Sequence, residues 1–194
     1  MKVKFALMRD TAKEPKVAYD DNDYAYDVYA DLNMMSLFRL NSKQQNLNIG
    51  EIEGGYLGFR EYDQIILTPR KRLVVPTGLK VELPETSEIE LYGQNFRLKW
   101  SLKVLPRSGL AANYGITVLN SPGIVDAGYR GEIGVILVNL SDEDFVIKQE
   151  MRIAQVTVES TLVPQFEFVQ VEHLTETKRS EGGMGSSGLG GKDV

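Results

Sequence analysis

Short apolar runs rich in β-branched residues, separated by glycine, proline, asparagine and aspartate, dominate this 194-residue chain. The alternation is clearest in Leu79–Leu83 (LKVEL) and Ile153–Val158 (IAQVTV), where every second side chain can face a core. No segment sustains a helical apolar period beyond about three turns. The sequence therefore predicts an all-β fold, a jelly-roll-like sandwich or barrel of short strands.

The expected strands share this apolar or alternating pattern, and they are Val3–Met8, Gln64–Thr68, Gly78–Leu83, Phe96–Leu105, Ile116–Leu119, Gly131–Asn139, Met151–Leu162 and Gln165–Val171. One short helix is expected over Ser108–Asn113. Ser108 can cap its N-terminus, and Gly115 can end it.

The composition excludes several kinds of chemistry. The chain has no cysteine and a single histidine, His173, so it has no disulfides, no thiolate nucleophile and no zinc site built on two imidazoles. A metal would be held by oxygen, which favours Mg²⁺ or Ca²⁺. At a net charge of −5 the chain is not expected to bind nucleic acid in general, so an anionic ligand needs a local concentration of arginines, backbone N–H groups or metal.

Length and hydropathy indicate one main domain outside the membrane. The apolar content of 42% is enough for a core, and no apolar run approaches the length of a membrane span. The start Met1–Phe5 lacks the long apolar segment of a signal peptide. We expect a cytoplasmic protein, located in the host cytoplasm if the chain is viral.

Two segments differ from the rest in composition. Asn33–Asp63 is polar and is interpreted as an inserted surface hairpin or loop, with a plain loop as the simpler reading. Ser180–Val194 is rich in glycine and serine, and composition alone would assign it to a disordered terminus.

Two early segments carry groups suited to metals and anions. Asp27, within the aromatic run Tyr24–Asp31, can act as an oxygen ligand or accept from metal-bound water, although such a run is also an ordinary strand with solvated acids. Arg107 and Ser108 stand where a strand leads into the predicted helix, and a helix N-terminus offers unpaired N–H groups. Ordinary capping with a structural salt bridge explains the second segment as well.

Three later segments complete the set of candidates. Asn120–Gly131 has the punctuation of a hairpin, and its turn also holds an acid, Asp126, and an aromatic residue, Tyr129. Arg152–Gln155 begins a strand. The side chains of Arg152 and Gln155 can each bind an anion, or they can bond only to neighbouring residues. Arg179–Gly188 combines glycines with hydroxyls, so its backbone can close over phosphates, although it lacks the ending and the setting of a P-loop.

In this order, the five segments resemble the motifs of the homotrimeric deoxyuridine triphosphatases, the dUTPases. The most specific matches are GIVDAGYRGEI at Gly123–Ile133 and PRSGLA at Pro106–Ala111, and RIAQV at Arg152–Val156 fits closely. The resemblance implies a jelly-roll subunit over residues 1–178, a trimer with active sites at the subunit contacts, and a C-terminal lid over residues 179–194.

The resemblance also implies an activity, the hydrolysis of dUTP to dUMP and pyrophosphate assisted by Mg²⁺. Asp126 would be the general base that activates water at the α-phosphorus, and Asp27 would orient waters on the metal. Arg152 matches the family's motif arginine and is either a phosphate contact or structural. The implied substrate-binding residues are Arg107, Ser108, Gly109, Asn120, Gly123, Val125, Tyr129, Gln155, Arg179, Gly183, Met184, Gly185, Ser186 and Ser187.

The chain departs from the family's pattern at three motif positions. Met184 stands where the family usually has a phenylalanine that stacks on uracil, and methionine covers a ring face without π-stacking. Ser180 and Ala25 each replace a usual glycine, with slight steric consequences.

Two alternatives remain open. The related dCTP deaminases, including their bifunctional form, share the trimeric fold, but they carry a catalytic glutamate where this chain has Ile136 and usually a tryptophan where it has Tyr129. A dUTPase-like regulatory protein could instead bind a protein partner through Asn33–Asp63, a segment without a role in the five motifs.

Overall fold

The computed structural model describes residues 2–20, 22–41, 64–164 and 166–177. The chain divides into two compact units, Met1–Pro164 and Gln165–Val194. The first unit holds the described strands and helices, which are β1 (Lys4–Leu7), β2 (Tyr26–Tyr29), α1 (Met34–Asn41), β3 (Gln64–Leu67), β4 (Arg72–Pro76), β5 (Leu79–Glu82), β6 (Ser87–Leu91), β7 (Gln94–Leu105), α2 (Ser108–Tyr114), β8 (Ile116–Val118), β9 (Gly123–Asp126), β10 (Gly134–Asn139), β11 (Phe145–Lys148) and β12 (Arg152–Pro164).

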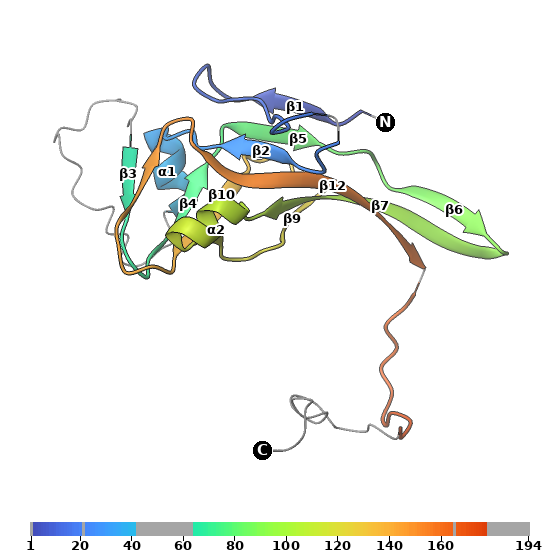
Figure 1. Cartoon of the computed structure of the whole chain (residues 1–194). Helices are drawn as coiled ribbons and strands as arrows, with labels where there is room; N and C mark the ends of the chain where they lie inside the picture. The colour runs from blue at the N-terminus through green and yellow to red at the C-terminus, as the bar shows by residue number, and fades with distance from the viewer. Residues whose placement is uncertain (1, 21, 42–63, 165, 178–194) are drawn as a thin grey trace. The chain divides into compact units, whose positions relative to one another are not determined.

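The strands form antiparallel sheets, which confirms the all-β prediction (Figure 1). The largest sheet has the order β2-β12-β7-β6, and β9 pairs with β7 beside it. A three-stranded sheet has the order β4-β10-β8, and two further pairs join β1 to β5 and β11 to β3. Among the described residues, no helix is long and apolar enough to cross a membrane.

The core lies where the inward faces of these sheets meet. Side chains from β4, β8, β10 and β12 are fully buried, including Val75, Ile116, Val135 and Ile153 at 1% exposure or less. Ile116, Val135 and Ile153 lie in runs that the sequence predicts as strands, whereas Val75 lies on β4, outside those runs.

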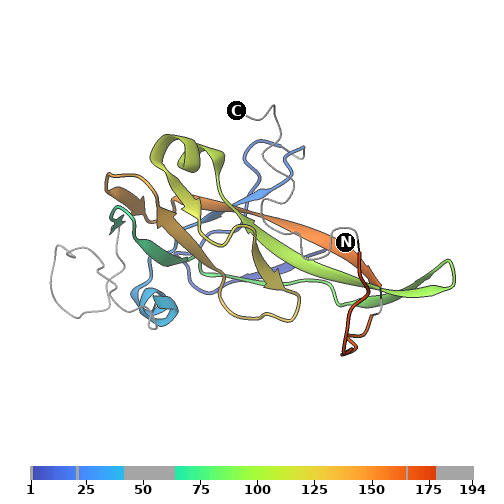
Figure 2. The same cartoon turned by 90° about the horizontal axis from the view of Figure 1, so that it is seen from below.

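The long strand β7 organises the largest sheet. It pairs with β12 along ten consecutive positions, from Leu105 opposite Gln155 to Phe96 opposite Pro164. The outer part of β7 forms a hairpin with β6 that reaches away from the two helices (Figure 1 and Figure 2). The inner part of β7 also pairs with β9, from Ser101 opposite Asp126 to Val104 opposite Gly123.

The structure adds a second helix to the single one expected. The predicted insertion Asn33–Asp63 begins with α1, and Leu37 on this helix is 1% exposed. Asn33 caps the helix, because its side-chain oxygen accepts from the N–H of Ser36 at 3.2 Å. The interpretation as a surface loop is therefore wrong for residues 34–41, and residues 42–63 lie outside the described part of the chain.

One predicted strand is absent from the described residues. The alternating segment Gln165–Val171 is irregular from 166 to 171, although Phe166 and Phe168 pack edge to face with centroids 5.5 Å apart. Alternation gives a segment a strand-like face, but a strand also needs a partner to satisfy its backbone N–H and C=O groups.

Candidate functional site

A buried carboxylate holds two arginines together at one end of the largest sheet. Asp27 on β2 lies opposite Gln155 on β12, and its side chain is 1% exposed. Its Oδ1 accepts from Nε of Arg107 at 3.0 Å, and its Oδ2 accepts from Nη1 of Arg152 at 3.2 Å. Arg107 also donates to the carbonyl of Arg152 at 3.3 Å. The structure thus brings together four of the predicted residues, with Asp27 as the anchor.

Helix α2 starts beside this cluster. The N-terminal cap is Arg107, in an extended conformation and without a side-chain capping bond, and Ser108 is the first helical residue. The expectation that Ser108 caps the helix is therefore wrong by one position. Ser108 and Gly109 are both exposed at the start of the helix, next to Arg107. Gly115 ends the helix in the left-handed conformation, as predicted.

The turn that follows β9 carries the predicted base, and the expected hairpin is wrong in its pairing, because β9 pairs with β7 while β10 pairs with β4 and β8. Asp126 is the last residue of β9 and is exposed, and its carbonyl accepts from the N–H of Tyr129 at 3.0 Å, which closes the turn. The Tyr129 hydroxyl donates to the carbonyl of Glu132 at 2.9 Å, while 44% of the residue stays exposed. At the base of β9, Nδ2 of Asn120 lies 3.1 Å from the point that a Cβ on Gly123 would occupy.

The acid and the arginine cluster occupy different positions along β7. Asp126 is opposite Ser101, whereas Asp27 and Gln155 are at the level of Leu105, and Arg107 follows β7. Arg107 lies six positions after Ser101, or about 20 Å along an extended chain. Within one chain the structure therefore does not bring Asp126 next to the arginines.

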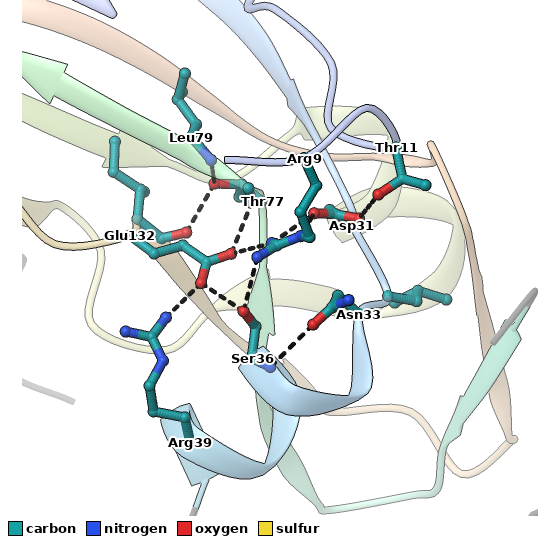
Figure 3. A network of polar contacts seen from close by, with 12 residues as sticks. Arg9, Thr11, Asp31, Asn33, Ser36, Arg39, Thr77, Leu79 and Glu132 are labelled. Atoms are coloured by element: carbon teal, nitrogen blue, oxygen red, sulfur yellow. Dashed lines mark hydrogen bonds and ion pairs between the residues drawn. The ribbon is translucent and has the colours of Figure 1, made fainter. Parts of the chain in front are cut away.

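A second charged network, which sequence reasoning missed, surrounds the Glu132 carboxylate (Figure 3). The Glu132 carboxylate is buried and accepts from Arg9, Ser36, Arg39 and the N–H of Gly78. Burial alone would raise the pKa of Glu132, but the bonds from Ser36, Arg9 and Gly78 and the charge of Arg9 together lower it below 4.5. The partners are far apart in sequence, so no local pattern signals this network.

Six of the predicted substrate-binding residues lie outside the described part of the chain. They share the C-terminal glycine- and serine-rich segment, and they are Arg179, Gly183, Met184, Gly185, Ser186 and Ser187.

The donor set limits how a metal can be held. Among the described residues no group of three or more acidic or histidine side chains gathers to bind a cation. Both oxygens of Asp27 already receive guanidinium bonds, which leaves one further lone pair on each for a water molecule. These residues do not form an all-protein cage, but they fit a Mg²⁺ ion bound mainly by substrate phosphates.

Comparison with known proteins identifies the family. A model of the dUTPase family matches residues 60–188. The deoxyuridine 5'-triphosphate nucleotidohydrolase of Clostridium novyi is 44% identical over 127 residues, which cover 66% of this chain and 79% of that protein. The chain belongs to the dUTPase family. The enzyme of the same description from Cytophaga hutchinsonii is 48% identical over 126 residues, covering 65% of this chain and 72% of that protein.

Solved dUTPase structures share the fold. A mutant dUTPase of Staphylococcus bacteriophage 80alpha with dUpNHpp superposes with a TM-score of 0.61 at 19% identity, covering 97% of this chain and 99% of that one. The dUTPase assignment therefore agrees with the architecture, including the N-terminal residues that lie before the matched range and contain Asp27.

Proposed function

We propose that the chain hydrolyses dUTP to dUMP and pyrophosphate, with Asp126 as the general base. The observation that carries this proposal is the placing of an exposed acid and Tyr129 on one tight turn, in a chain that belongs to the dUTPase family. Asp126 takes a proton from a water molecule as its oxygen attacks the α-phosphorus. The bond from that phosphorus to the bridging oxygen breaks, and pyrophosphate leaves.

The arginine cluster suits the phosphate end of the substrate. A triphosphate carries three to four negative charges, which a chain of net charge −5 must offset locally. Arg107 stands at the start of α2 with Ser108 exposed beside it, and Gln155 lies at the same level of the sheet. Arg179 and the C-terminal lid over residues 179–194 add further phosphate donors. When bound, Mg²⁺ would neutralise phosphate charge, with Asp27 contacting it through water.

In this proposal, β9 and the turn after it bind the nucleoside part of the substrate. Tyr129 packs under the deoxyribose and leaves no room for a ribose 2′-hydroxyl, while Asn120, Gly123 and Val125 border the uracil. A backbone donor aimed at uracil O4 would meet a second donor in cytosine, and an unpaired buried donor costs about 1–3 kcal/mol. Selection works mainly by exclusion.

We infer that the working unit is a homotrimer with each site between subunits. The separation of Asp126 from Arg107 along β7 supports this inference, since a substrate reaching both groups is more easily accommodated across a subunit contact. We place the reaction in the cytoplasm, or in the host cytoplasm for a viral chain.

The test combines a substrate panel with one substitution. Wild-type protein is assayed for pyrophosphate release from dUTP, dCTP, dTTP and UTP with and without Mg²⁺, and dCTP is also assayed for ammonia. We expect release from dUTP alone, dependent on Mg²⁺. Ammonia from dCTP would overturn the proposal in favour of a deaminase.

Asp126→Asn keeps the size of the side chain and removes its basicity. We expect pyrophosphate release to fall by about a thousandfold or more, in line with the loss of a general base that contributes about 10²–10⁴-fold. Binding of dUpNHpp, measured by calorimetry, and the circular dichroism spectrum should stay unchanged. Near-normal turnover would refute the role of Asp126.

A further inference from the structure

The buried Glu132 carboxylate, just after the turn that carries Tyr129, accepts hydrogen bonds from several parts of the chain. It accepts from Nη2 of Arg9 at 2.6 Å, from the Ser36 hydroxyl at 2.8 Å and from the N–H of Gly78 at 2.9 Å, and it pairs with Arg39. These donors come from the loop after β1, from α1 and from the link between β4 and β5. One side chain thus connects the segment after the Tyr129 turn to the loop after β1, to α1 and to the link between β4 and β5.

Arg9 extends the network to a second buried acid (Figure 3). Its Nε donates to Asp31 at 2.6 Å, and its Nη1 donates to the Ser36 hydroxyl at 3.0 Å. Thr11 donates to the other oxygen of Asp31 at 2.9 Å. Burial alone would lower the pKa of Arg9, but Glu132 and Asp31 together raise it, so the guanidinium stays charged. Because its partners constrain it from several directions, the Glu132 side chain has little freedom to shift.

The backbone of Glu132 passes this constraint to Tyr129. The Glu132 carbonyl accepts from the Tyr129 hydroxyl at 2.9 Å, and the next residue, Ile133, is fixed by Thr77 at 2.7 Å and by the Leu79 carbonyl at 2.9 Å. The Tyr129 ring lies over Gly131, where an added Cβ would come within 2.3 Å of the hydroxyl oxygen. The ring is therefore held at its hydroxyl and supported along its side.

We propose that Glu132, held by Arg9 and Ser36, is a positioning residue that fixes Tyr129 and thereby sets the discrimination between deoxyribose and ribose nucleotides. This proposal rests on the proposed function, in which Tyr129 packs against the sugar. A ring that excludes a single hydroxyl works only while its place is fixed, and a misplacement of about 1 Å can cost about 10²-fold in rate. Loosening the anchor gives the 2′-hydroxyl room, so UTP gains relative to dUTP.

The test measures the ratio of kcat/KM for dUTP to that for UTP in three variants. Tyr129→Phe removes only the bond to the Glu132 carbonyl, Ser36→Ala removes one donor from the anchor, and Glu132→Gln removes its charge. We expect each to lower the ratio by about tenfold or more, mainly through a higher KM for dUTP and a lower KM for UTP. In Ser36→Ala and Glu132→Gln, which alter residues away from the substrate, kcat for dUTP should stay within about threefold of wild type.

A double-mutant cycle separates positioning from general loss of stability. If Ser36 acts through the Tyr129 hydroxyl, the effects of Ser36→Ala and Tyr129→Phe on the ratio will not add. Ser141→Ala is the matched control, because its hydroxyl bonds to Asn139 and Glu143 in a loop that does not contact the network. We expect the control to leave the ratio unchanged.

The outcomes divide clearly. A lowered ratio with non-additive effects supports the positioning role. Variants that unfold more easily yet keep the wild-type ratio within about twofold would overturn it, as would fully additive effects. If Glu132→Gln does not fold, Ser36→Ala and Tyr129→Phe still decide the question. Failure of the proposed function is recognised separately, since wild-type protein would then release no pyrophosphate from dUTP.

Discussion

Asp27 makes contacts that its residue type alone does not suggest. An acid near a phosphate site suggests a metal ligand, but the structure places this carboxylate beneath two arginines, at 3.0 and 3.2 Å. The guanidinium groups are partly exposed, with side-chain exposures of 23% for Arg107 and 49% for Arg152. The buried charge therefore holds two partly exposed arginines in place.

Replacing this anchor should reduce both stability and substrate affinity. Asp27→Asn leaves two arginines without a carboxylate, and we expect a loss of about 3 kcal/mol in the free energy of unfolding, the lower end for breaking a buried pair. Urea denaturation measures this loss. The control is Asp142→Asn, whose exposed partner Arg70 lies at 2.7 Å, and we expect a change below about 1 kcal/mol. Equal losses in both variants would contradict the anchoring role.

The lowered pKa of Glu132 predicts how the free energy of unfolding changes in acid. Its pKa is lowered in the folded protein, so the stability it contributes is fully present above the ordinary value of 4.5 and is lost as pH falls through the lower folded-state pKa. We expect the difference in unfolding free energy between wild type and Glu132→Gln to be constant near neutral pH and to shrink below pH 4.5. A difference that persists undiminished to about pH 2 would contradict the lowered pKa.

At the residue scale, sequence could find groups with a local signature and not those defined by distant partners. Asp126 and Tyr129 are recognisable because a turn, an acid and an aromatic residue share one short segment. Arg9 and Glu132 are 123 positions apart, and each looks like an ordinary surface charge in the sequence. Only the folded chain shows that the partly buried Arg9 reaches the buried Glu132.

At the scale of elements, periodicity located most strands because one face of each is buried. The runs that became β5 and the first part of β10 bury every second residue, whereas β12 buries the neighbours Ile153 and Ala154, next to an irregularity in its pairing with β2. Helix α1 was missed because eight residues give too few turns for a clear period, and the polar residues after it dominate the composition. The signal that could have found it is Asn33, a good capping residue before Met34.

Helix α1 should contribute substantially to stability although it opens the predicted insertion. Leu37 is buried, so Leu37→Ala should lower the unfolding free energy by about 2–5 kcal/mol. Met35 on the same helix is 66% exposed, and Met35→Ala should change the unfolding free energy by less than about 0.5 kcal/mol. Thermal and urea denaturation measure both. If Leu37→Ala left the free energy of unfolding unchanged, the helix would not be part of the core.

At the scale of the whole molecule, the separation along β7 makes a prediction about assembly. If each site takes Asp126 from one subunit and Arg107 from another, two inactive variants should repair each other. Asp126→Asn and Arg107→Ala refolded together in equal amounts should recover up to about a quarter of wild-type sites, because random mixing pairs two intact halves that often. Pyrophosphate release measures the recovery, and each variant refolded alone is the control.

The result would also identify where the site is built. A mixture no more active than its separate components would place both groups in a single chain and contradict the intersubunit site.

The separation of Asp126 from Arg107 along β7 also predicts how mutant alleles of the gene complement each other. Damaging substitutions at Asp126, which lies opposite Ser101, and at Arg107, which follows Leu105, are expected to form two classes of allele within one gene. Alleles from different classes would complement each other in a cell that carries both, whereas alleles from the same class would not. Complementation in such a cell would thus show that the two residues of one site come from different subunits.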